Sequence, residues 1–296
     1  MNDVIIKALA FNKSVRVYAV SNTNILNDIG KRLGYYPSAL DAMGRVLSMG
    51  AMMGSMLKLE ETITIKIEGN GPIGKIIVDS DAHGHIRGYC DNPHCHFEYH
   101  DFRLNAKQTV GTSGFISVIK DLKLKEPFIG STPIISGEIA EDFAYYFQVS
   151  EQIPSAVGLG VLVDTDNTAK ASGGFIIQLM PDTSEEVIDK LEKKLKLIPS
   201  VSEMLSSGYT PVDMIYNIVE DVEILEKIPL EFYCNCSKER FARGILSLGA
   251  NEIKEMIDED KTQETTCHFC GNKYYFTKED LEEIYKLAKE KECKTC

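Results

Sequence analysis

The chain has 296 residues, 44% of them hydrophobic and 26% charged, which is ordinary for a globular protein and long enough for two or three structural units. Its formal net charge is −12 and no part of it is basic, so it lacks the Lys/Arg patch that a nucleic-acid-binding protein needs. The first residues show no signal-peptide pattern and no apolar run approaches the roughly 18 residues of a membrane helix, so we expect a cytoplasmic protein without a membrane partner.

Residues 1–180 have the pattern of a mixed α+β domain. A long helix is expected from Pro37 to about Leu59, and another near 138–147. Strands are expected at 14–20, 61–67, 75–80, 84–90, 157–164 and 172–180. Because strands and helices do not alternate regularly, we expect a mixed β-sheet with helices rather than a parallel doubly wound sheet.

The segment from Gly69 to Ile76 nearly matches GxxxxGK[ST], the phosphate-binding loop of nucleotide hydrolases. Ile76 stands where that loop has the hydroxyl that ligates Mg²⁺, and the following residues are expected to form a strand rather than a helix. We therefore interpret the segment as the turn of a β-hairpin that binds no nucleotide.

Two other clusters in this domain, one of histidines and cysteines and one of methionines, each allow two interpretations. Five of the six histidines lie between His83 and His100 with Cys90 and Cys95, but without a recognised ligand spacing. Surface histidines and half-buried cysteines are therefore favoured over a second metal site. Half of the methionines lie on the long helix, where a buried helix is favoured over an adaptable binding surface.

Residues 181–230 predict a helical linker. Its signals are the capping-box pairs Thr183/Glu186 and Ser200/Glu203, the apolar stripe Val187, Ile188, Leu191, Leu195 and Ile198, and a third helix start at Thr210–Pro211. Short helices separated by prolines are marginally stable, and this segment has five basic against eleven acidic residues. We therefore interpret it as a linker that can fold or melt.

Residues 231–296 contain two close cysteine pairs, Cys234-Asn-Cys236 and Cys267-His-Phe-Cys270. Two pairs brought together by a fold give four thiolates at the corners of a tetrahedron, the arrangement that Zn²⁺ prefers. We predict one Zn²⁺ per chain, bound by Cys234, Cys236, Cys267 and Cys270. A domain this small needs such a metal for stability.

Other residues of this domain are assigned more ordinary roles. His268 could replace a sulfur, but with four thiols available it is expected beside the ligands or at the surface. Cys293 and Cys296 are interpreted as spare thiols in a frayed tail. Residues 237–257 are expected to be helical and 273–276 extended.

The spacing alone leaves open whether the zinc site is structural or a redox switch. Most four-cysteine sites are structural, whereas a CxC pair places two sulfurs close enough to join once the metal leaves.

No Ser/His/Asp order, HExxH or paired-carboxylate pattern is present, so we expect no enzyme. An oxidoreductase using Cys293/Cys296 or Cys267/Cys270 would need a thioredoxin-like context. A zinc-ribbon protein of transcription or translation would need a basic face, and this domain has 11 basic against 14 acidic residues.

In its order of short motifs, the chain resembles the heat shock protein 33 family over nearly its whole length. The motifs are Val15-Arg16, Gly44-Arg45, Gly69-Asn-Gly-Pro72, Arg87-Gly88-Tyr89, Asn92-Pro93, Ser150-Glu-Gln152, Gly173-Gly174-Phe-Ile-Ile-Gln178, Cys234-Asn-Cys236-Ser237 and Cys267-His-Phe-Cys270. Each string is weak alone, but their order together with the CxC and CxxC spacing is specific.

The resemblance implies a redox-regulated, ATP-independent holdase chaperone of the bacterial cytosol that binds unfolding proteins. Reduced protein would be zinc-bound and inactive. Oxidation would join Cys234 to Cys236 and Cys267 to Cys270, expel zinc, and yield a homodimer that holds clients through residues 1–180. We further expect the 181–230 linker to be docked with zinc and disordered without it. Cys90, Cys95, Cys293 and Cys296 are extra to the family pattern.

Overall fold

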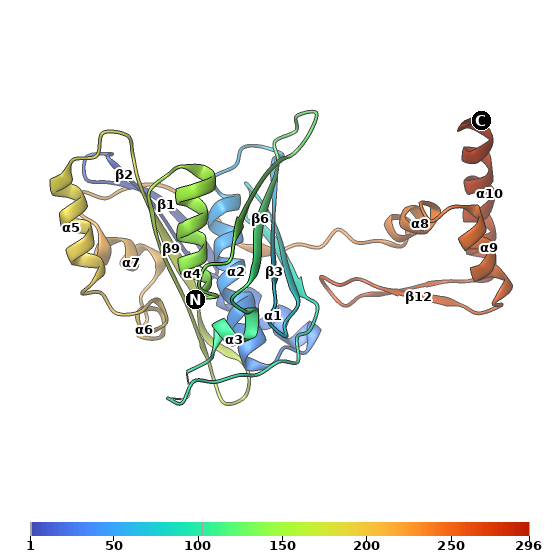
Figure 1. Cartoon of the computed structure of the whole chain (residues 1–296), viewed down its shortest axis with the longest axis horizontal. Coiled ribbons are helices and arrows are strands. Elements are labelled where there is room, and N and C mark those ends of the chain that lie inside the picture. The colour runs from blue at the N-terminus through green and yellow to red at the C-terminus, as the bar shows by residue number, and fades with distance from the viewer. Residues whose placement is uncertain (1, 102, 296) are drawn as a thin grey trace. The chain divides into compact units, whose positions relative to one another are not determined.

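The computed structural model describes residues 2–101 and 103–295, with side chains as far as Lys291. The chain forms two compact units, one ending at Tyr233 and the other beginning at Cys234 (Figure 1). The predicted α+β class is confirmed. Among the described residues, no helix is long and apolar enough to cross a bilayer.

The first unit is built on two sheets. The first sheet has the order β10 (Glu223–Pro229), β1 (Val4–Ala10), β2 (Val15–Ser21), β9 (Ala169–Leu179) and β8 (Ser155–Val163), all antiparallel. The second has the order β11 (Glu231–Phe232), β5 (His85–Cys90), β4 (Lys75–Asp81), β3 (Thr62–Gly69), β6 (Gly114–Asp121) and β7 (Phe128–Pro133). Only β11 among these described strands pairs in parallel, with β5. The Gly69–Ile76 hairpin is confirmed, because β3 and β4 pair antiparallel on either side of its turn.

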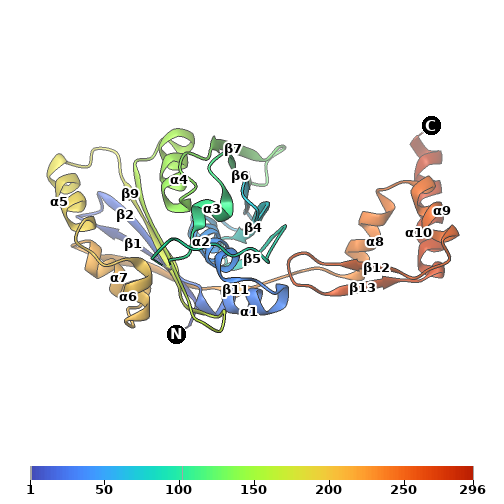
Figure 2. The same cartoon turned by 60° about the horizontal axis from the view of Figure 1, so that its bottom comes forward.

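Helix α2 (Pro37–Gly54) packs between the two sheets, contacting β2, β8 and β9 on one side and β3, β4 and β5 on the other (Figure 2). Its methionines at 43, 49, 52 and 53 are at most 2% exposed, so the interpretation as a buried helix is confirmed. The helix ends at Gly54 rather than near Leu59. A Cβ added at Gly54 would collide with the Ser80 hydroxyl and would lie 2.9 Å from the Asp81 carbonyl oxygen. The neighbouring helical elements are α1 (Thr23–Leu33), α3 (Ala106–Val110), α4 (Ile139–Tyr146) and the π-helical turn η1 (Phe147–Glu151).

Three helices of the predicted linker cover the opposite face of the first sheet (Figure 1). They are α5 (Glu185–Leu195), α6 (Val201–Ser206) and α7 (Pro211–Ile218). The Ser200/Glu203 capping box is confirmed, but the Thr183/Glu186 box is wrong. Helix α5 begins one residue later, after Ser184, because the Thr183 hydroxyl lies within hydrogen-bond distance of the Ser14 and Met180 carbonyls instead.

The apolar stripe of the linker therefore has a partner within its own unit, namely the side chains of β1, β2 and β9. The linker then continues into β10, an edge strand that pairs with β1 and that the sequence did not reveal. Contacts place residues 181–230 in the same compact unit as the preceding residues. The functional division at 180 and 230 stays a prediction.

The second unit contains α8 (Lys238–Leu246), α9 (Ala250–Asp258), β12 (Gln263–Thr266), β13 (Lys273–Phe276) and α10 (Lys278–Thr295). The helical stretch predicted over 237–257 is divided at Gly249, whose φ of +95° lies in the left-handed region that favours glycine. The helices pack around a small apolar cluster of Ile245, Ala250, Ile253, Phe276, Leu281, Ile284 and Ala288. The unit therefore has an apolar core in addition to its cysteines.

Candidate metal centre

The first cysteine pair lies in the extended segment just before α8. Cys234 and Cys236 are half-buried. The segment ends at Ser237, whose hydroxyl accepts a hydrogen bond from the Arg240 amide and so caps α8. In an extended chain alternate residues point to the same side, so Cys234 and Cys236 present their sulfurs together.

The second pair lies in the loop between β12 and β13. The Cys267 amide donates to the Asn272 carbonyl at 2.9 Å, and the Gly271 amide donates to the Cys267 carbonyl at 2.8 Å. Gly271 has φ +73°, which lets the loop turn tightly back. Cys267 and Cys270 are both 5% exposed, so this loop supplies the two buried cysteines of the cluster.

The four sulfur atoms converge on one point. The Sγ atoms of Cys234 and Cys267 are 3.7 Å apart, those of Cys236 and Cys270 are 3.3 Å apart, and all four lie within 4.8 Å of one another. A tetrahedral site with Zn–S bonds of about 2.3 Å has sulfurs about 3.8 Å apart, whereas a disulfide requires about 2.05 Å. The four cysteines therefore form no disulfide in this structure, and the size and all-sulfur chemistry of the cluster fit one Zn²⁺.

The thiols of the cluster differ in acidity. Burial raises the pKa of Cys234 and of Cys270. Burial also acts to raise the pKa of Cys236, but hydrogen bonds from the Tyr274 hydroxyl and from neighbouring thiols outweigh it and bring that pKa to about 7. Metals bind thiolates, so the lowered pKa of Cys236 favours metal binding through its sulfur at neutral pH.

Tyr274 is a site residue that the sequence analysis missed. Its hydroxyl lies 3.1 Å from the Cys236 Sγ, and its ring packs against Phe241 with 5.1 Å between centroids and an interplanar angle of 35°. Hydrogen bonding to Cys236 raises the pKa of Tyr274 to about 12, so it remains a donor. Strand alternation over 273–276 could have indicated that Tyr274 and Phe276 face inward, while Tyr275 is 51% exposed.

The remaining candidates lie apart from the cluster. His268 is exposed and outside the four-sulfur group. Cys90 and Cys95 are buried in the main core, more deeply than expected, and no metal-binding group in the described part of the chain includes them. Cys293 and Cys296 lie outside the residues whose side chains are described.

Comparison with known proteins shows that this chain is similar to 33 kDa chaperonins. The family model described as Hsp33 protein matches residues 3–277. The 33 kDa chaperonin of Halalkalibacterium halodurans is 49% identical over 97% of this chain and 100% of its own length, and that of Oceanobacillus iheyensis is 50% identical over 96% and 99%. The crystal structure of the 33 kDa chaperonin from Thermotoga maritima has a TM-score of 0.90 and 34% identity, covering 97% of this chain and 99% of that one.

Proposed function

This chain belongs to the Hsp33 family and is a redox-regulated molecular chaperone, and we propose that its four-cysteine cluster is the zinc-dependent switch of that activity. The observation that carries the proposal is the convergence of four sulfurs, from two separate pairs, within 4.8 Å. When bound, zinc would keep these sulfurs as thiolates and add folding free energy on the order of 10 kcal/mol. Reduced protein would accordingly be folded throughout and inactive as a chaperone.

Oxidation would join Cys234 to Cys236 and Cys267 to Cys270. In each pair the two thiolates would lose two electrons to one molecule of peroxide as the S–S bond forms and the O–O bond breaks, and with two protons the peroxide would become two molecules of water. The distances within the cluster do not select this pairing, because every sulfur in it is close to every other. Chain connectivity supports it instead. Once the cluster opens, partners two or three positions apart in the chain stay near each other, whereas partners more than 30 positions apart separate.

The 181–230 linker would be the element that moves. Its helices are six to eleven residues long, too short to persist without a partner surface. Release would expose their apolar faces together with the strands beneath them, which offers unfolding clients a broad apolar surface. We propose that residues 1–180 hold clients without ATP and that the active form is a homodimer.

We place this activity in the cytoplasm, where thiols are reduced at rest and a thiol switch can report oxidation. The alternative of a constitutively folded zinc-ribbon protein in transcription or translation is not favoured, because the relatives are chaperonins and the second unit has no excess of basic residues. We propose no enzymatic activity and no nucleic-acid or membrane partner.

The test compares reduced, zinc-loaded protein with peroxide-treated protein in suppressing the aggregation of a thermally unfolding client. Activity is expected after oxidation only, with release of one zinc per chain and no effect of ATP. The variant Cys236→Ser should lose zinc without oxidant, while His268→Ala should switch normally. Full activity of the reduced zinc form, or a requirement for ATP hydrolysis, would contradict the proposal.

A further inference from the structure

Helix α5 is the least secured of the three linker helices. Helices α6 and α7 each begin with a complete capping box, and they bury three and four side chains respectively. Helix α5 has no side-chain cap, and Leu191 is its single fully buried residue. Its docking therefore depends on a few apolar contacts with the sheet.

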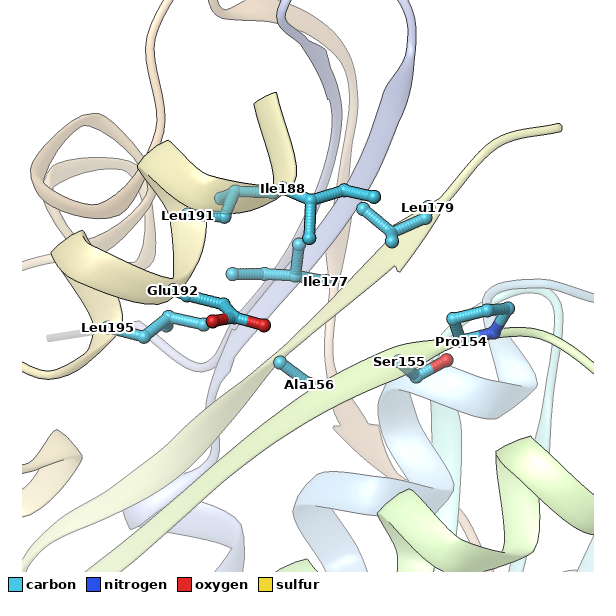
Figure 3. A pocket seen from close by; sticks show the side chains of 9 residues that line it. All are labelled: Pro154, Ser155, Ala156, Ile177, Leu179, Ile188, Leu191, Glu192 and Leu195. Atoms are coloured by element: carbon cyan, nitrogen blue, oxygen red, sulfur yellow. The ribbon is translucent and has the colours of Figure 1, made fainter. Parts of the chain in front are cut away.

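A pocket of about 190 Å³ lies between α5 and the sheet (Figure 3). Ile177 and Leu179 of β9 form its floor, and Ile188, Leu191 and Leu195 of α5 form its opposite wall. The small side chain of Ala156, at the start of β8, leaves the space open on the remaining side. Because the helix spans this space rather than filling it, dispersion contacts are missing where α5 meets the sheet.

One charged group faces the pocket. The carboxylate of Glu192 points into the space between α5 and Ala156 (Figure 3). In the part of the chain that the structure describes, this carboxylate has neither a hydrogen bond nor an ion pair. Ser155, at the other end, is already satisfied, because its hydroxyl donates to the Ile153 carbonyl and accepts from the Gln178 amide. Glu192 is exposed, so the pocket combines apolar walls with one unpaired carboxylate at its solvent edge.

We propose that this pocket is a binding site for a small amphipathic cation, a phenyl-sized apolar group carrying an ammonium. An apolar cavity of about 150 Å³ accommodates benzene, so the present volume suits a ring with a short arm. The ring would lie against Ile177 and Leu191, and the ammonium would donate a charge-assisted hydrogen bond to Glu192. The net charge of −12 would also favour cationic over anionic ligands.

Occupancy of the pocket regulates α5, and this part of the inference rests on the proposed function of the linker. The pocket exists only while α5 is docked, so a ligand that fills it binds the docked form alone. Such a ligand multiplies the ratio of docked to released linker by about 100 at a concentration of 100 times its Kd. An amphipathic cation would therefore delay activation of the chaperone by oxidant.

Binding is tested on the reduced, zinc-loaded full chain with phenethylamine as the probe, followed by NMR. Saturable shifts are expected at α5 and at the start of β8. Glu192→Gln should weaken binding about tenfold, and uncharged 2-phenylethanol should bind equally weakly to the unmodified protein. Ala156→Leu, which fills the pocket, should abolish binding, while Glu186→Gln, whose side chain is 79% exposed on the outer side of α5, should change nothing. No saturable binding, or binding indifferent to both Glu192→Gln and Ala156→Leu, would overturn the proposal.

The effect of the ligand on α5 and on chaperone activation is measured in a separate experiment. Saturating phenethylamine should slow hydrogen exchange of α5 amides and lengthen the delay before peroxide-treated protein becomes active, and neither effect should appear in Ala156→Leu. Binding without either effect would overturn the proposed regulation of α5 but not the proposed binding site. If peroxide never activates the protein, the proposed function fails, whereas the binding result stands on its own.

Discussion

The hydroxyl of Tyr274 lies 3.1 Å from the sulfur of Cys236 and 3.1 Å from the carbonyl oxygen of the same residue. Strand β13 thereby holds the first cysteine pair from a point 38 residues further along the chain. A phenol at this position orients one ligand and restrains the segment that carries it. Partners of this kind around a metal site commonly change its affinity 10- to 100-fold.

Replacing Tyr274 with Phe should weaken zinc binding about tenfold, because the sulfur loses its donor while the packing against Phe241 remains. Affinity is measured by competition with a chromophoric chelator under reducing conditions. Tyr275→Phe is the matched control, since that ring is 51% exposed and should leave the affinity unchanged. Equal losses in both variants would show that the Tyr274 hydroxyl has no specific role.

Removing zinc with a chelator under reducing conditions should unfold much of the second unit and leave the sheets of the first unit intact. Among the described residues, the second unit has seven buried apolar residues in its core, which is too few to offset the loss of metal-binding free energy on the order of 10 kcal/mol. Hydrogen exchange resolved by segment checks this. Residues from Cys234 onward should exchange within seconds, while β2 and β9 remain protected; protection retained in both regions would contradict the prediction.

Cys90 should resist alkylation in the folded protein. Burial raises its pKa to about 12, so at pH 8 its thiolate is roughly 1000-fold scarcer than that of an ordinary thiol. Treating native protein with iodoacetamide and mapping the products by mass spectrometry should find Cys90 unmodified, and denatured protein should be fully modified. Labelling in the native state at the rate of a free thiol would instead indicate frequent opening of the main core.

Truncating Leu191 to Ala should loosen α5. The side chain is 4% exposed, and its loss should cost about 2 kcal/mol of docking free energy, equivalent to roughly 30-fold faster exchange of α5 amides. The variant should also reach full chaperone activity at lower peroxide doses. Leu197→Ala is the control, because that leucine is 81% exposed. If the two variants behave alike, α5 docking does not limit activation.

Cysteine spacing predicted which four residues converge, because ligands in close pairs are positioned by short loops that can be recognised in the sequence. Their role as zinc ligands and the disulfide pairing stay predictions. Strand β10 was missed because it is an edge strand whose side chains are mostly exposed, which removes the apolar alternation that identifies a half-buried strand. Tyr274 and the pocket beside Glu192 could not be predicted, since both depend on which distant elements pack together.

Burial of the methionines has a consequence for a protein that works in the presence of oxidants. Methionine sulfur is itself oxidised to a polar sulfoxide, and those of α2 are shielded between two sheets. Met204 of α6 and Met214 of α7, at most 1% exposed, pack against the first sheet and would lose that protection when the linker is released. Sulfoxide at either residue would place a polar group on a face that must return to an apolar cluster. Prolonged exposure would therefore leave the linker progressively less able to redock after the disulfides are reduced, so full recovery would depend on methionine sulfoxide repair.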